Sequence, residues 1–141
     1  MNDADKNSSN WQNTSSGGQR VLVTGGTGFL GAYIIKELVA RGHTVRAIRR
    51  SDKLPFYIPS AVFENVEWVP GDVLDVVSLE EALEGVDAVI HAAAKVSFSR
   101  KDRGQLFSTN IEGTANIVNC ALAQNLKRFV HVSSEIGRAH V

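Results

Sequence analysis

The chain has 141 residues, of which 43% are apolar, and its 15 basic and 15 acidic residues give a formal net charge of zero. These values fit one globular domain and exclude a wholly disordered chain. Charge balance gives no general attraction to nucleic acid, and no apolar run approaches the ~20 residues of a membrane span, so we expect neither partner. The single Cys120 excludes an internal disulfide and indicates a cytoplasmic location.

Residues 1–19 differ in composition from the rest of the chain. They are rich in Asn, Ser, Gly and Asp, and they lack the apolar stretch of a secretory signal. Such a segment cannot bury enough apolar surface to offset the entropy lost on ordering. We therefore predict a flexible tail.

From residue 20 onward, predicted strands alternate with predicted helices. The expected strands are Arg20–Thr24, Thr44–Arg49, Val66–Val69, Asp87–Ala92 and Arg128–Val132. The expected helices are Phe29–Arg41, ended by Gly42; Ser78–Glu84, capped by Ser78 and Glu81; and Gln105–Gln124, buried through Ile111, Ala115, Val118 and Leu122. Residues 51–61 are expected to be mostly loop. This alternation indicates an α/β fold with βαβ units and a parallel sheet.

The segment Thr24–Gly31, TGGTGFLG, joins the first expected strand to the first expected helix. Its glycines fit both G-x-G-x-x-G and G-x-x-G-x-x-G spacing. Such glycines permit a tight turn, close approach of a pyrophosphate and close packing of helix on strand. The helix N-terminus then favours the anion. We predict a dinucleotide site, because this strand–loop–helix context disfavours a turn without a ligand.

The end of the second expected strand bears on the choice of dinucleotide. It carries Arg49 and Arg50, where an NAD-binding domain usually has an acidic residue for the ribose hydroxyls. Two guanidinium groups suit the 2′-phosphate of NADP, so we favour NADP, with NAD possible; a solvated basic strand end is the alternative. Asp72 and Val73, after the third strand, are candidates for contacting adenine. A simple turn role for Asp72 fits equally well.

Five segments together resemble the extended short-chain dehydrogenase/reductase family, also described as NAD-dependent epimerase/dehydratases. The resemblance covers about residues 20–134, and it is carried by Thr24–Gly31, Gly71–Asp75, His91–Ala94, Asn110–Thr114 and Val132–Ser134. It implies a Rossmann-type, doubly wound parallel sheet, here truncated after about five strands. The run Val45–Arg50 is similar to the dihydroflavonol-reductase-like branch.

The resemblance also implies roles for individual positions. Ser134 matches the catalytic serine, which would hydrogen-bond a substrate carbonyl or alcohol, and Asn110 lies near the catalytic centre. Arg50 matches an arginine that contacts the 2′-phosphate. No metal site is expected. The full set of implied cofactor-binding residues is Gly25, Thr27, Gly28, Phe29, Leu30, Gly31, Arg49, Arg50, Asp72, Val73, Ala92, Ala93, Ala94 and Ser133.

The chain departs from the family pattern in its catalytic base. The family uses Tyr-x-x-x-Lys, but the residues four positions after Tyr33 and Tyr57 are glutamate and alanine. The final Ile-Gly-Arg-Ala-His-Val can be encoded by a sequence that resembles a common sequencing adapter. We therefore expect residues 20–134 to be an incomplete N-terminal fragment, inactive alone, and residues 135–141 to be non-native read-through.

The expected function is that of the cofactor-binding part of an NAD(P)-dependent oxidoreductase acting on a carbonyl/alcohol pair of a small molecule. The resemblance allows a homodimer for the full-length protein. An NAD-dependent sugar-nucleotide epimerase/dehydratase is the first alternative. A non-catalytic NADP-sensing regulatory domain is the second, although Ser134 favours an enzyme.

Overall fold

The computed structural model describes residues 18–51, 54, 58–93 and 103–133, and the structural statements below refer to these residues. Residues 1–17 of the predicted tail and the predicted read-through segment 135–141 lie outside them. The last two residues of the predicted tail join the sheet: Gly18 forms a β-bridge, and the carbonyl oxygen of Gln19 accepts a hydrogen bond of 3.0 Å from Thr44 N.

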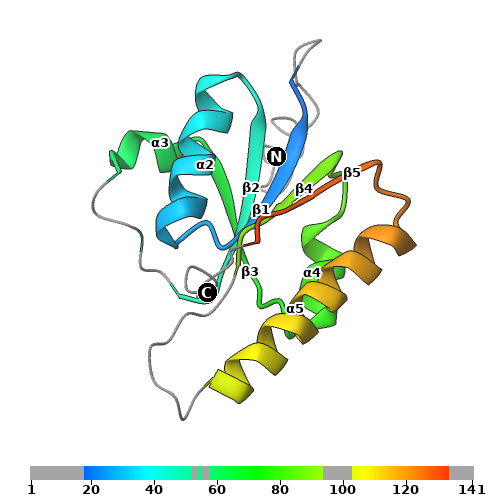
Figure 1. The fold of residues 1–141 in the computed structure, drawn as a ribbon. Coiled ribbons are helices and arrows are strands. Elements are labelled where there is room, and N and C mark those ends of the chain that lie inside the picture. The colour runs from blue at the N-terminus through cyan, green and yellow to red at the C-terminus, as the bar shows by residue number, and fades with distance from the viewer. Residues whose placement is uncertain (1–17, 52–53, 55–57, 94–102, 134–141) are drawn as a thin grey trace, which may run out of the picture.

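A five-stranded parallel sheet, in the order β3-β2-β1-β4-β5, forms the centre of the molecule (Figure 1). The chain order reverses between β1 and β4, as in a doubly wound Rossmann sheet. The predicted fold class is therefore confirmed, and each predicted strand is present. The strands are β1 Arg20–Thr24, β2 Thr44–Arg49, β3 Val66–Pro70, β4 Ala88–His91 and β5 Arg128–His131.

Helices cover both faces of the sheet (Figure 1). On one face lie α2, Phe29–Ala40, and α3, Ser60–Glu64, and on the other lie α4, Val76–Ala82, and α5, Arg103–Ala123. Successive residues of a strand face opposite layers, so Val21 and Val23 of β1 join the core beneath α2 while Leu22 joins the core beneath α4 and α5. None of the described helices has the length and apolar character of a membrane span.

Helix α2 ends as the sequence predicts. Gly42 has a φ of +84°, the left-handed conformation that glycine adopts without steric cost. Its N–H donates to the carbonyl oxygen of Val39, and the N–H of His43 donates to that of Leu38. The left-handed conformation of Gly42 thus provides hydrogen-bond donors for carbonyl groups of the last turn and directs the chain into β2.

The predicted start of α4 is wrong by two residues. The N-cap is Asp75, whose carboxylate accepts a hydrogen bond from Ser78 N at 3.4 Å. Ser78 lies within the first turn, and its hydroxyl donates to the carbonyl oxygen of Asp75 at 2.8 Å. Aspartate caps a helix as well as serine does, and here it comes first in the chain. The short helix α3, anchored by the buried Phe63, has no counterpart in the predicted elements.

The buried stripe of α5 is also different from the predicted one. Ile111 and Leu122 are 54% and 67% exposed. They are eleven residues apart, about three turns, so they share one side of the helix. The opposite side is the buried one, and it carries Gly113, Ile117, Cys120 and Ala121. The predicted stripe therefore lies mainly on the outer side, with Ala115 exposed as well and Val118 half-buried.

Arg46 is a buried basic residue of β2 with a structural role. Its side chain donates to the carboxylate of Glu67 at 2.9 Å and to the carbonyl oxygens of Ala82 and Glu84 at 2.7 Å each. The two carbonyls lie at the C-terminal end of α4, where a cation is favourable. Arg46 therefore fastens α4 to the middle of the sheet.

His91, only 1% exposed, joins β1, β4 and α5. Its Nδ1 lies 2.6 Å from the hydroxyl of Thr24, which also accepts from Ala93 N at 3.3 Å, and its Nε2 lies 3.0 Å from the hydroxyl of Thr114. Burial, with a smaller contribution from the stacked ring of His131, lowers the pKa of His91 from 6.5 to about 4. The network therefore holds a neutral imidazole.

This arrangement predicts a loss of stability on acidification. Between pH about 6.5 and about 4 the unfolded chain binds a proton that native His91 does not, so the free energy of unfolding falls as the pH falls through that window. The contribution of His91 is of the order of 3 kcal/mol. Denaturant unfolding measured from neutral pH to pH about 4 should show a smaller fall for His91→Gln than for wild type. An unchanged slope in His91→Gln would contradict the prediction.

Candidate functional site

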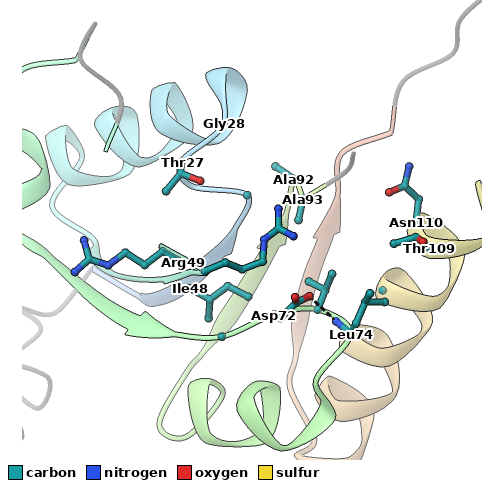
Figure 2. Close-up of a pocket in the computed structure, with 15 residues that line it drawn as sticks. Thr27, Gly28, Ile48, Arg49, Asp72, Leu74, Ala92, Ala93, Thr109 and Asn110 are labelled. Atoms are coloured by element: carbon teal, nitrogen blue, oxygen red, sulfur yellow. Dashed lines mark hydrogen bonds between the residues drawn. The ribbon is translucent and has the colours of Figure 1, made fainter. Parts of the chain in front are cut away.

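A cleft of about 270 Å³ lies at the carboxyl ends of the strands (Figure 2). In an open α/β sheet, ligands bind in this place, where the strand order reverses. The structure brings ten of the predicted site residues to its walls: Gly25, Thr27, Gly28, Arg49, Arg50, Asp72, Val73, Ala92, Ala93 and Asn110. The sequence motifs, separated by up to 85 positions, therefore meet around one cavity.

The glycine loop packs main chain against main chain. Gly25 has a φ of +75°, and a Cβ on it would lie 2.6 Å from the main-chain atoms of Ala92 and Ala93. A Cβ on Gly31 would overlap the carbonyl oxygen of Gly25. Gly31 is buried and is not among the residues that line the cleft, so its geometry fits the packing role that the motif assigns to the last glycine.

The first turn of α2 opens beside this loop. Its N-cap, Gly28, has an extended conformation and supplies no side-chain cap, and the turn contains no acidic residue. The N–H groups of such a turn lack partners within the helix and favour an anion. The side chains of Phe29 and Leu30 are exposed and do not line the cleft. A role for these two residues in cofactor binding would thus rest on their main-chain N–H groups.

The end of β2 brings two arginines to the cleft. Arg49 and Arg50 both line it. The guanidinium carbon of Arg49 lies 5.6 Å from the centroid of the Trp68 ring. Asp72, after β3, is the one acidic residue among the described residues that line the cleft. The β2 end of the cavity is therefore basic.

Asp72 has the turn role that the sequence left open. One of its carboxylate oxygens accepts a hydrogen bond from Leu74 N at 2.9 Å. Its neighbour Val73 is fixed by α5, because Asn116 donates to the carbonyl oxygen of Val73 at 2.9 Å and a Cβ on Gly113 would lie 2.7 Å from the Val73 side chain. The turn and α5 together form the wall where we predict adenine to bind.

The opposite end of the cleft is where a catalytic centre is predicted. Ala92 and Ala93 form its wall, and Asn110 faces it from α5 (Figure 2). Ser133 is exposed and does not line the cleft. Ala94 and Ser134 lie outside the described residues. Within the described part of the chain, no cluster of three His, Cys, Asp or Glu could hold a metal ion.

Five further residues line the cleft without having been predicted to bind the cofactor: Ile48, Gly71, Leu74, Thr109 and Gly113. Thr109 and Gly113 flank Asn110 on α5, so helical spacing from that one residue could have identified Gly113. Ile48 and Leu74 lie next to predicted residues but carry no polar signal. Their positions depend on how the strand ends meet.

Comparison with known proteins finds relatives that are named as reductases. The chain is 38% identical over 113 residues to a putative dihydroflavonol 4-reductase of Synechocystis sp., covering 80% of this chain and 32% of that protein. It is 35% identical to cinnamoyl-CoA reductase 1 of Petunia hybrida, covering 85% and 36%. The chain thus spans about a third of the length of the curated relatives it matches.

Solved structures show the same fold. A short-chain dehydrogenase/reductase superfamily protein from Agrobacterium tumefaciens with bound NAD has a TM-score of 0.66 and 35% identity, over 82% of this chain and 32% of that one. A UDP-glucose-4-epimerase from Stenotrophomonas maltophila with bound NAD has a TM-score of 0.72 and 27% identity, over 82% and 37%.

The family resemblance predicted from the motifs is confirmed by a model that matches nearly the whole chain. That model, described as the NAD dependent epimerase/dehydratase family, covers residues 21–140. It therefore includes every residue that lines the cleft and the whole sheet except Arg20, the first residue of β1. The chain belongs to the NAD dependent epimerase/dehydratase family.

Proposed function

We propose that this chain is the cofactor-binding part of an oxidoreductase that prefers NADP and acts on a carbonyl/alcohol pair of a small molecule. The observation that carries the proposal is the pair Arg49 and Arg50 in the cleft at the end of β2. Guanidinium groups form charge-assisted hydrogen bonds with phosphate, whereas an NAD site usually places a carboxylate there. Similarity to proteins named as reductases supports the proposal of an oxidoreductase that acts on a carbonyl/alcohol pair.

We propose that a dinucleotide lies along this cleft. The first turn of α2 would hold the pyrophosphate, the arginine pair the 2′-phosphate, and Val73 the adenine ring. Ala92 and Ala93 would leave room for the nicotinamide ribose. The cofactor supplies hydride transfer, and the protein orients and polarises the reacting groups.

The catalytic part of the proposal concerns groups near Asn110. Asn110 lines the cleft at the end where the nicotinamide would lie. Ser134 would hydrogen-bond the substrate oxygen, and a base must exchange the alcohol proton. Neither Tyr33 nor Tyr57 has a lysine four residues later. We therefore propose that these 141 residues are inactive alone and that the base lies elsewhere in the whole protein.

An NAD-dependent sugar-nucleotide epimerase or dehydratase is the competing proposal. It is supported by the structural similarity to a UDP-glucose-4-epimerase with bound NAD. A regulatory domain that binds NADP without catalysis would share the cleft but would not oxidise or reduce a substrate. Cofactor preference separates the first alternative from our proposal, and turnover by the whole protein separates the second.

Cofactor binding measured by calorimetry tests the preference. NADPH should bind more tightly than NADH, and Arg50→Gln should weaken NADPH binding about tenfold or more while leaving NADH unchanged, because a hydrogen bond to a charged group is lost. Arg41→Gln is the matched control, since Arg41 pairs with Glu37 on the surface of α2 and does not line the cleft. Tighter binding of NADH to the wild type would favour the epimerase/dehydratase alternative.

We also propose that the whole protein is a homodimer that uses the outer sides of α4 and α5. We call this surface the α4–α5 face, and its exposed apolar residues are Val76, Val77, Ile111 and Leu122. Helix α5 has apolar residues on its outer side, Ile111 and Leu122, in addition to those on its buried side. A self-complementary apolar surface suits a twofold interface.

Sedimentation of the whole protein tests this interface. Leu122→Glu should raise the dimer dissociation constant by about tenfold or more, because it places a charge in a desolvated apolar contact. Tyr33→Glu on α2, which covers the opposite face of the sheet, should leave association unchanged (Figure 1). A protein that is monomeric before substitution, or equally associated after it, would refute the proposal.

A cytoplasmic location remains part of the proposal. The chain has one cysteine, Cys120, which is a buried free thiol. Burial raises the pKa of this thiol, which lowers the fraction of reactive thiolate. Such a cysteine suits a reducing compartment.

A further inference from the structure

We infer that Trp68 is a positioning residue that sets cofactor preference by holding the Arg49 guanidinium at the 2′-phosphate end of the cleft. The inference rests on the proposed NADP preference and names the side chain that would produce it. Trp68 lies on β3 and does not itself line the cleft. It would act through Arg49, which does.

The contact between the two side chains has the geometry of a cation–π interaction. The guanidinium carbon of Arg49 lies 5.6 Å from the centroid of the Trp68 ring. An arginine within about 6 Å of a tryptophan ring is attracted by the negative face of the ring. This contact restricts where the end of the long Arg49 side chain lies.

Packing fixes the ring on which Arg49 rests. Phe63 of α3 contacts Trp68 edge-on, with 5.6 Å between ring centroids and 64° between ring planes. The far edge of the indole reaches under the glycine loop, where a Cβ on Gly26 would lie 3.5 Å from it. Because its neighbours on both sides are core elements, the ring is a rigid support for the guanidinium.

The indole nitrogen gives a second reason to assign Trp68 a role. Trp68 Nε1 is buried and has no hydrogen-bond partner within the described residues. An unpaired buried N–H is costly, and a phenylalanine at this position would avoid that cost. The larger indole face, which is the best cation–π partner among side chains, accounts for a tryptophan here.

The two arginines differ in how they would meet a phosphate. Arg49 is half-buried and supported by the ring, whereas Arg50 is exposed. Ordering a mobile arginine on binding costs side-chain entropy, and a side chain already held in place loses less. Arg49 would therefore be the preorganised contact and Arg50 the one ordered by binding.

The test uses two ligands that differ only in the 2′-phosphate, adenosine 2′,5′-bisphosphate and 5′-AMP. The quantity measured by calorimetry on the whole protein is the ratio of their dissociation constants. Trp68→Leu should reduce the preference for the bisphosphate about fivefold, and Trp68→Phe should retain most of it. Arg49→Gln should reduce it about tenfold. The double variant, Trp68→Leu with Arg49→Gln, should match Arg49→Gln alone.

Each outcome bears on one claim. A wild type without any preference for the bisphosphate refutes the proposed NADP preference, and this inference falls with it. A preference that survives Trp68→Leu but is lost in Arg49→Gln refutes the inference alone. Equal weakening of both ligands also overturns it, because Trp68 would then support the cleft in general.

A second measurement keeps the test decisive if Trp68→Leu fails to fold. Fluorinated tryptophan incorporated at position 68 keeps the shape of the ring and weakens its negative face. The preference for the bisphosphate should fall stepwise as fluorine atoms are added, while 5′-AMP binding stays constant. A preference that does not change with fluorination refutes the inference.

Discussion

The cleft depends on a main-chain contact between the glycine loop and the end of β4. Gly25 lies directly on the peptide joining Ala92 to Ala93, and Gly31 lies directly against Gly25. No side chain fits in either place, so strand, loop and helix approach as closely as backbones can. Where Gly25, Ala92 and Ala93 line the cavity, the contact between them is made by main-chain atoms, which cannot change rotamer. The basic and polar groups around it are arranged on a fixed base.

A second constraint ties the walls of the cleft to this base. His91 contacts Thr24 of β1 and Thr114 of α5, while Thr24 also binds the N–H of Ala93. One neutral imidazole therefore sets the distance between the alanine wall and the helix that carries Asn110. Because these groups are buried, any rearrangement would leave polar atoms without partners. The geometry around Asn110 is thus coupled to the core of the sheet.

The sequence predicted best what is decided locally. The five strands, the glycine loop and the end of α2 at Gly42 follow from short patterns, and the structure has them where those patterns place them. The outward stripe of α5 was misjudged because helical period fixes the spacing of apolar residues but not the side that meets the sheet. Apolar residues occur on both sides of this helix, and only tertiary packing decides which side is buried.

In the site, too, residues in local motifs were predictable from the sequence, and residues placed by tertiary packing were not. Motif residues such as Arg50 and Asp72 were identifiable because charge and position in a motif are visible in the sequence. Ile48 and Leu74 were not, since they line the cleft only through the approach of neighbouring strand ends. The contact between Arg49 and Trp68 joins residues 19 positions apart on adjacent strands. Nothing in the sequence pairs them before the strand register is known.

Strand β2 divides its arginines between two tasks. Arg46 faces α4 and is committed to Glu67 and to the end of that helix, whereas Arg49 faces the ring of Trp68 beneath α2. Arg46, which anchors α4, is thus a different residue from Arg49 and Arg50, which line the cleft. Evolution could exchange the residues at positions 49 and 50 without disturbing the anchoring of α4. If these two arginines select the cofactor as proposed, substitutions at their positions would change that choice while the anchor of α4 stays in place.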